Sequence, residues 1–127
     1  MFSHVMLGAN DIEKSKKFYD AALGALGLKE GFTDPKGRVA YRTKTGIFML
    51  SKPLDGKPAN GANGGTLGFA AETTAAVDAW HKAGLAAGGT AIEDPPGIRS
   101  NNGMNLYIAY LRDPSGNKVC AMHRVVA

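Results

Sequence analysis

Cysteine is almost absent from this sequence of 127 residues, which contains only Cys120. One cysteine cannot form a disulfide within the chain, and it excludes zinc sites that are built on pairs of cysteines. The sequence also lacks an apolar run close to the roughly 18 to 20 residues of a membrane-spanning helix, and it shows no basic, apolar leader. We therefore expect a cytoplasmic protein with no membrane partner.

Acidic residues are fewer than basic ones. The sequence contains 15 Lys and Arg and 11 Asp and Glu, so its formal net charge is +4. A basic balance can indicate nucleic-acid binding. Here the excess is scattered through residues 1–64, and it comes with no helix-turn-helix, no aromatic RNA-binding motif and no arginine cluster. A solvated surface explains such a distribution, so we expect no nucleic-acid partner.

Glycine, in contrast, is abundant, with 17 residues that follow no collagen-like period. Several of them cluster with Pro and Asn between Pro53 and Gly65, which is the composition of a linker. The length suits a single domain over residues 1–127. We divide it into a first unit at about 1–57, a linker at about 53–65 and a second unit at about 65–127.

The large apolar residues of the two halves coincide when the chain is shifted by 62 positions. This shift pairs Val5 with Leu67 and Phe18 with Trp80, although few residues are identical. A fixed offset of this kind predicts an internal structural repeat, in which one supersecondary unit occurs twice. Because they are large and lie at matched positions, Phe18 and Trp80 should be core residues of two equivalent helices.

Strand-like segments begin and end each copy of the repeat. The first copy has them at residues 2–7, 38–42 and 46–51, and the second at 66–70, 106–111 and 118–122. The last two are joined by a run of turn-forming residues, Asp113–Asn117. The second strand pair of each copy therefore reads as a hairpin.

A helix should follow the first strand of each copy. Asn10 and Glu13 have the spacing of a capping box for the first helix, whose apolar stripe includes Phe18 and Leu23. Thr73 or Thr74 could cap the second. Its inward face would consist of Val77, Trp80, His81, Gly84 and Leu85.

These patterns predict an α+β fold of two tandem βαβββ units, whose curved, mixed and mainly antiparallel sheets surround a cleft. A unit of about 60 residues buries too little surface to be comfortably stable alone. The units should therefore pair through their sheets, either within one chain or across a homodimer.

Three segments resemble the vicinal oxygen chelate superfamily, which includes glyoxalase I, bleomycin and fosfomycin resistance proteins and extradiol dioxygenases. They are the opening strand Phe2–Gly8, the helical Lys17–Tyr19, and the final hairpin Leu111–Val119 with its Asp-Pro-x-Gly-Asn turn. The resemblance covers essentially the whole chain. Within the superfamily, the segments Lys52–Pro58, Gly97–Arg99 and Cys120–His123 are similar to a bacterial glyoxalase-like group.

The resemblance implies a cleft site with four positions, which in the catalytic branches hold one metal ion through His, Glu or Gln. In this sequence the four positions fall on His4, Met49, Thr66 and Cys120. Only His4 keeps a usual ligand, and none of the four is a carboxylate. Metal-dependent proton abstraction needs both an electrophile and a base. We therefore expect no metal, although a divalent ion is an open alternative and the cofactor is otherwise unknown.

The expected ligand-binding residues lie on the cleft wall and on one loop. Strand alternation and the resemblance together place there His4, Met49, Thr66, Arg99, Asn102, Tyr107, Cys120 and Met122. Tyr107, or a neighbour of opposite parity, joins this wall according to the register of its strand. Arg99 and Asn102 would contact an anionic or polar ligand, or else belong to a solvated loop.

Two residues are candidates for catalysis, and each has a structural alternative. His4 could be a residual ligand or base, or a buried histidine that is hydrogen-bonded to a neighbour. Cys120 could be a reactive thiol, or a small apolar residue that packs in the core. His123, on the opposite face from Cys120, is more in keeping with a structural or interface role.

A protein that binds a small molecule in the sheet cleft, without the usual metal-dependent chemistry, fits these observations best. Its lining is mostly apolar with scattered polar groups, as in small-molecule pockets. The alternative is a divergent metal-dependent lyase or dioxygenase of the same superfamily. In either case we expect a small-molecule ligand and a homodimer.

Overall fold

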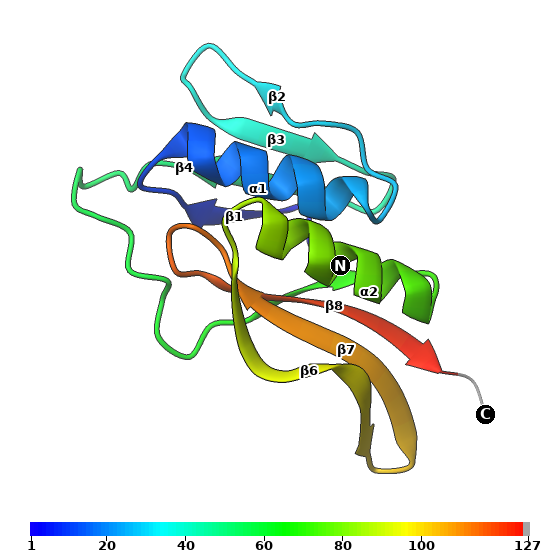
Figure 1. Ribbon diagram of the computed structural model, residues 1–127. Helices are drawn as coiled ribbons and strands as arrows, with labels where there is room; N and C mark the ends of the chain where they lie inside the picture. Colours follow the sequence, from blue (N-terminus) through cyan, green and yellow to red (C-terminus); the bar gives the residue numbers. More distant parts are fainter. Residues whose placement is uncertain (126–127) are drawn as a thin grey trace.

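A computed structural model describes residues 1–125 and shows two βαβββ units (Figure 1). The first unit consists of β1 (His4–Gly8), α1 (Ile12–Gly24), β2 (Phe32–Thr33), β3 (Val39–Arg42) and β4 (Ile47–Ser51). The second consists of β5 (Leu67–Ala70), α2 (Thr74–Ala86), β6 (Thr90–Asn101), β7 (Met104–Arg112) and β8 (Lys118–Val125). The predicted α+β class and the predicted repeat are confirmed. In this part of the chain, neither helix has the length and hydropathy needed to cross a membrane.

Each unit forms one four-stranded sheet with the same topology. The strand orders are β1-β4-β3-β2 and β5-β8-β7-β6, so β1 and β5 both lie at a sheet edge. The pairs β1–β4 and β5–β8 are parallel, and the remaining pairs are antiparallel. The sheets are therefore mixed and mainly antiparallel, as the sequence predicts.

The register reproduces the sequence repeat residue by residue. Met6 pairs with Met49 across β1 and β4, and Gly68 pairs with Cys120 across β5 and β8. Because Met6 and Gly68 differ by the same 62 positions, Met49 and Cys120 occupy equivalent places in the two sheets.

The cap of α1 differs from the prediction. Asp11, and not Asn10, is the N-cap residue, and its carboxylate accepts a hydrogen bond from the N–H of Lys14. The Asn10 side chain instead binds the linker, accepting from Ala59 N at 2.7 Å and donating to Ala59 O at 3.2 Å. Two adjacent residues could both cap a helix, and the linker contact determines which one does.

The cap of α2 is one of the two predicted residues. Thr73 caps α2 through its hydroxyl, which accepts from the N–H of Ala76. The inward face of this helix is narrower than predicted: Val77, Trp80 and Gly84 are buried, whereas 40% of Leu85 is exposed.

The core lies on the helix-covered faces of the two sheets. Phe18 and Trp80 are completely buried, as their matched positions predict. Around Tyr19 the aromatic rings of both units meet, since its ring lies 4.8 Å from that of Phe48 and 6.3 Å from that of Phe69. One continuous cluster therefore joins the two units.

The units contact each other through their helices and through the last turn. Helices α1 and α2 lie side by side (Figure 1). At the turn, Asp113 accepts a hydrogen bond of 2.6 Å from the hydroxyl of Tyr19, and the Asn117 side chain donates to Gly8 O at 2.8 Å. The prediction that the units pair through their sheets is not met within the described residues, where no strand of one sheet pairs with a strand of the other.

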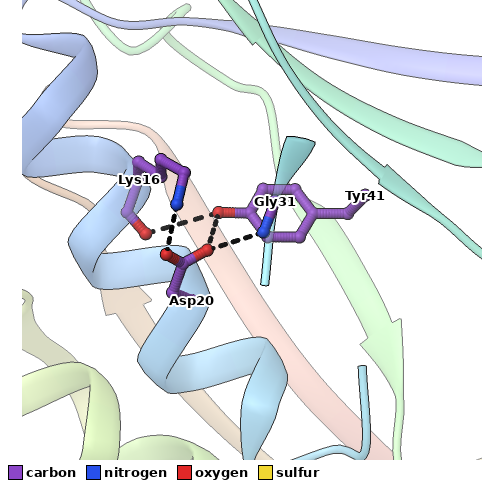
Figure 2. Close-up of polar contacts among 4 residues, drawn as sticks. All are labelled: Lys16, Asp20, Gly31 and Tyr41. Carbon is purple, nitrogen blue, oxygen red and sulfur yellow. Dashed lines mark hydrogen bonds and ion pairs between the residues drawn. The ribbon is translucent and has the colours of Figure 1, made fainter. Parts of the chain in front are cut away.

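A polar cluster fixes the segment that enters the first hairpin (Figure 2). Asp20 accepts hydrogen bonds from Gly31 N and from the hydroxyl of Tyr41, both at 2.8 Å, and it forms an ion pair with Lys16. Although burial alone would raise the pKa of Asp20, these hydrogen bonds lower it below its usual value. The carboxylate is therefore charged and holds the chain after α1 against β3.

Candidate functional site

Each sheet has one face covered by a helix and one uncovered face. In β4, Phe48 and Leu50 are buried in the core, so the alternating Ile47, Met49 and Ser51 point to the uncovered face. The same alternation in β8 separates Val119 and Ala121, which are completely buried, from the residues between them. The uncovered faces are the surfaces on which the candidate site residues lie.

The four positions implied by the resemblance are divided between the two sheets. His4 and Met49 share the uncovered face of the first sheet, on the paired strands β1 and β4. Cys120 lies on the uncovered face of the second, and Thr66 directly precedes β5 on that side. Each sheet thus presents one half of the expected site.

His4 is exposed, and its Nδ1 lies 2.9 Å from the hydroxyl of Ser3. His4 therefore has the hydrogen bond to a neighbour that the structural alternative predicts, but the burial predicted with it is wrong. His123 is the histidine with a structural contact, since its Nδ1 lies 3.0 Å from the carbonyl oxygen of Ala71 at the end of β5.

Cys120 is packed, with 5% of its surface exposed. Burial raises the pKa of its thiol to about 11; Lys118 acts in the opposite direction and Glu93 reinforces the rise. The thiol is therefore protonated at neutral pH, which favours the packed residue over the reactive one because the thiolate is the nucleophilic form.

The donor set does not fit a divalent metal of the kind that this fold implies. The four positions offer one imidazole, a thioether, a hydroxyl and a protonated thiol, whereas such ions prefer imidazole and carboxylate. Among residues 1–125, no three His, Cys, Asp or Glu side chains come together as a possible metal site.

Tyr107 lies on the helix-covered face, where its hydroxyl donates to Asp78 of α2 at 2.7 Å. The register pairs Tyr110 with Cys120 and Ile108 with Met122, so Tyr110 and Ile108 are the residues of β7 on the uncovered face. Counting outward from the turn Asp113–Asn117, where Arg112 pairs with Lys118, would have given this register from the sequence.

Arg99 and Asn102 both follow an irregular part of β6. The ladder with β7 shifts between Ile92 and Gly97, and the Arg99 guanidinium donates to the carbonyl oxygens of Asp94 and Pro95 at 2.9 and 3.1 Å. Arg99 therefore spans this bulge. Asn102 occupies the turn between β6 and β7 with φ of 50°.

Sequence reasoning missed Glu93, which lies inside the bulge. Its φ of 59° is unusual for a residue other than glycine, and its carboxylate lies 2.5 Å from Nζ of Lys118. Lys118 in turn lies 4.8 Å above the ring of Tyr110. The bulge thus places the ion pair of Glu93 and Lys118 beside Cys120. No local sequence pattern predicts this ion pair, because its two residues lie on different strands.

Pockets occur on both uncovered faces and between the units. Met6 and Ser51 line a pocket of about 450 Å³ on the first sheet, and Thr66 and Lys118 line one of about 550 Å³ at the end of the second. A third, of about 370 Å³, lies between α1 and β5. Its mainly apolar lining includes Val5, Leu23, Leu26, Leu28, Phe48, Leu67 and Phe69.

The fold and the repeated register define a protein of paired βαβββ units with one uncovered face on each sheet. Residues 1–121 match the model of the Glyoxalase/Bleomycin resistance protein/Dioxygenase superfamily, and the chain belongs to this superfamily. The resemblance inferred from the opening strand, the first helix and the last hairpin is confirmed. No curated protein has significant sequence similarity to the chain.

A crystal structure of a glyoxalase/bleomycin resistance protein from Albidiferax ferrireducens T118 is 55% identical, with a TM-score of 0.94 over 98% of this chain and 99% of that one. Two others share the fold at lower identity. A glyoxalase/bleomycin resistance protein/dioxygenase family enzyme from Burkholderia phytofirmans PsJN is 21% identical, with a TM-score of 0.73 over 97% and 98% of the chains. A glyoxalase-related enzyme from Fulvimarina pelagi is 17% identical, with a TM-score of 0.72 over 97% and 87%.

Proposed function

We propose that this protein binds a small organic molecule between the uncovered faces of its sheets, without the metal-dependent chemistry of the catalytic branches. The observation that carries the proposal is the donor set: Met49, Thr66 and Cys120 stand at three of the four site positions, and the Cys120 thiol is protonated at neutral pH. What remains is a largely apolar surface with a few polar groups, which suits ligand binding.

A second copy of the chain completes the site in this proposal. The uncovered faces keep large apolar side chains exposed, including 42% of Met6 and 66% of Phe32. Among the described residues, no further strand pairs with the outer side of β1 or β5, and such edges favour pairing with another chain. A homodimer would bring the first sheet of one copy against the second sheet of the other, within the cytoplasm.

Metal analysis and mass measurement test the two parts of the proposal. Protein purified without chelator should contain no stoichiometric transition metal, and light scattering should give twice the chain mass of 13.3 kDa. A stoichiometric metal that is lost in His4→Ala would contradict the proposal and favour a divergent metal-dependent lyase or dioxygenase. A monomer at micromolar concentration would contradict the shared cleft.

The neutral dye Nile red tests ligand binding itself. We expect Met49→Lys to weaken dye binding by about tenfold or more, because an ammonium group in an apolar site is costly to desolvate. Leu85→Lys, at an exposed apolar position on α2, is the matched control and should bind as the wild type does. Equal binding by both variants would contradict the proposed cleft.

A further inference from the structure

Two cations face each other at one end of the second sheet. Arg112 and Lys118 pair directly across β7 and β8, on the same face as Cys120. Like charges that lie directly opposite each other on a sheet destabilise it. A negative charge near this end of the sheet would therefore reduce the repulsion between Arg112 and Lys118.

Glu93 provides a negative charge for Lys118. Its carboxylate contacts Lys118 at 2.5 Å, from a backbone conformation that costs roughly 1 to 3 kcal/mol in a residue other than glycine. Among the ion pairs of the described residues, none involves Arg112; one of its guanidinium nitrogens donates to the carbonyl oxygen of Gly116 at 2.8 Å. A guanidinium carries five N–H donors, and this hydrogen bond uses one of them.

These two cations line a polar pocket of about 550 Å³. Its opposite wall is the linker Asn60–Thr66, in which Gly61, Ala62 and Gly64 have positive φ values. Of the lining residues, which all belong to the described part of the chain, none is Asp or Glu. The pocket therefore presents two positive charges, a threonine hydroxyl and peptide groups.

We infer that this pocket binds an oxyanion, the carboxylate or phosphate group of the cleft ligand, between Arg112 and Lys118. A guanidinium matches such a group with two parallel hydrogen bonds, and the bound charge would relieve the repulsion between the cations. Thr66, which is one of the four site positions, also lines the pocket. The inference thus rests on the proposed function and specifies its ligand as an anion whose body extends toward Cys120.

Inorganic phosphate and acetate are the probes, titrated separately by calorimetry at constant ionic strength. We expect saturable binding of at least one probe. The affinity for that probe should fall about tenfold or more in Arg112→Gln, because charge-assisted hydrogen bonds are removed. Arg112→Lys keeps the positive charge and should lose less affinity than Arg112→Gln. Arg124→Gln removes an exposed arginine from the other end of β8 and should bind as the wild type does.

Glu93→Gln provides a test of opposite sign. Removing the negative charge beside Lys118 should tighten anion binding severalfold. Binding of phosphate alone would identify a phosphate group as the anchor, and binding of acetate would identify a carboxylate. No saturable binding of either probe, or an equal loss in Arg112→Gln and Arg124→Gln, would overturn the inference. Nile red binding is a separate readout, so failure of the anion pocket is distinguishable from failure of the proposed cleft.

Discussion

The hydroxyl of Tyr19 donates a hydrogen bond of 2.6 Å to Oδ2 of Asp113, which lies in the other unit. Both side chains are buried. Oδ1 of Asp113 also accepts from the backbone N–H groups of Ser115 and Asn117. One carboxylate therefore shapes the last turn of the second unit and holds it against the first helix.

Tyr19→Phe should lower the free energy of unfolding by about 2 kcal/mol, because it leaves a buried carboxylate without one of its donors. Urea denaturation followed by circular dichroism measures the change. Tyr107→Phe is the matched control, since its hydroxyl also donates to an aspartate, Asp78, but at an exposed site. Equal losses in the two variants would show that burial does not strengthen the Tyr19 contact.

The protein should lose stability in alkaline solution through Tyr19. Burial, followed by the charge of Asp113 and its hydrogen bond, raises the pKa of Tyr19 well above 10.0. Above pH 10 the unfolded chain loses this proton and the folded chain keeps it, so the free energy of unfolding falls by up to ~1.4 kcal/mol per pH unit. Below pH 10 this contribution is fully present. The Tyr19→Phe variant should show a shallower decline in denaturant titrations, and an identical slope would contradict the prediction.

Two glycines near α1 should respond oppositely to alanine. A Cβ at Gly31 would lie 2.5 Å from Cγ1 of Val39 and 2.7 Å from the ring of Tyr41, both buried. Gly31→Ala should therefore destabilise the protein by roughly 1 to 3 kcal/mol through overpacking. Gly24, the last residue of α1, has no atom within 4 Å of such a Cβ, so Gly24→Ala should stabilise by about 0.5 to 1 kcal/mol. Thermal melts of both variants measure these effects, and a gain in Gly31→Ala would refute the steric argument.

Alkylation of Cys120 by iodoacetamide should be slow in the native protein. Raising the pKa of its thiol from 9.0 to about 11 reduces the thiolate fraction at neutral pH about 100-fold relative to the unfolded chain, and burial slows access further. Mass spectrometry of native and urea-unfolded protein measures both rates. Glu93→Gln should speed the native reaction, because Glu93 helps to raise this pKa. A native rate as fast as the unfolded one would restore the reactive-thiol alternative.

Local patterns in the sequence predicted the repeated architecture. The offset of 62 residues aligned Phe18 with Trp80, and both are core residues. A large apolar side chain on the inward face of an amphipathic helix is most stable when it is buried against the sheet. The cap of α1 was predicted one residue too early. Asn10 and Asp11 are equally good caps by type, and only the contact of Asn10 with Ala59 distinguishes them.

The candidate site was harder to predict because it depends on contacts between strands. Tyr107 and Tyr110 have opposite parity in one strand, and the register of that strand, which can be counted from the turn Asp113–Asn117, decides which of them lies on the uncovered face with Cys120. Glu93 belongs to a bulge whose irregular backbone has no signature in the two-residue alternation. The division of His4 and Cys120 between two sheets likewise follows from topology, not from residue type.

The contact of Asn117 with Gly8 has a consequence for how the protein forms during synthesis. The side-chain amide of Asn117 donates to a carbonyl oxygen at the end of the first strand, 109 residues earlier. The first unit is translated long before this partner exists, so a ribosome-bound chain that stops short of residue 117 lacks the amide that binds this carbonyl oxygen. Contacts between such distant residues also slow folding. The nascent first half should therefore stay open to chaperones and proteases until the last hairpin leaves the exit tunnel.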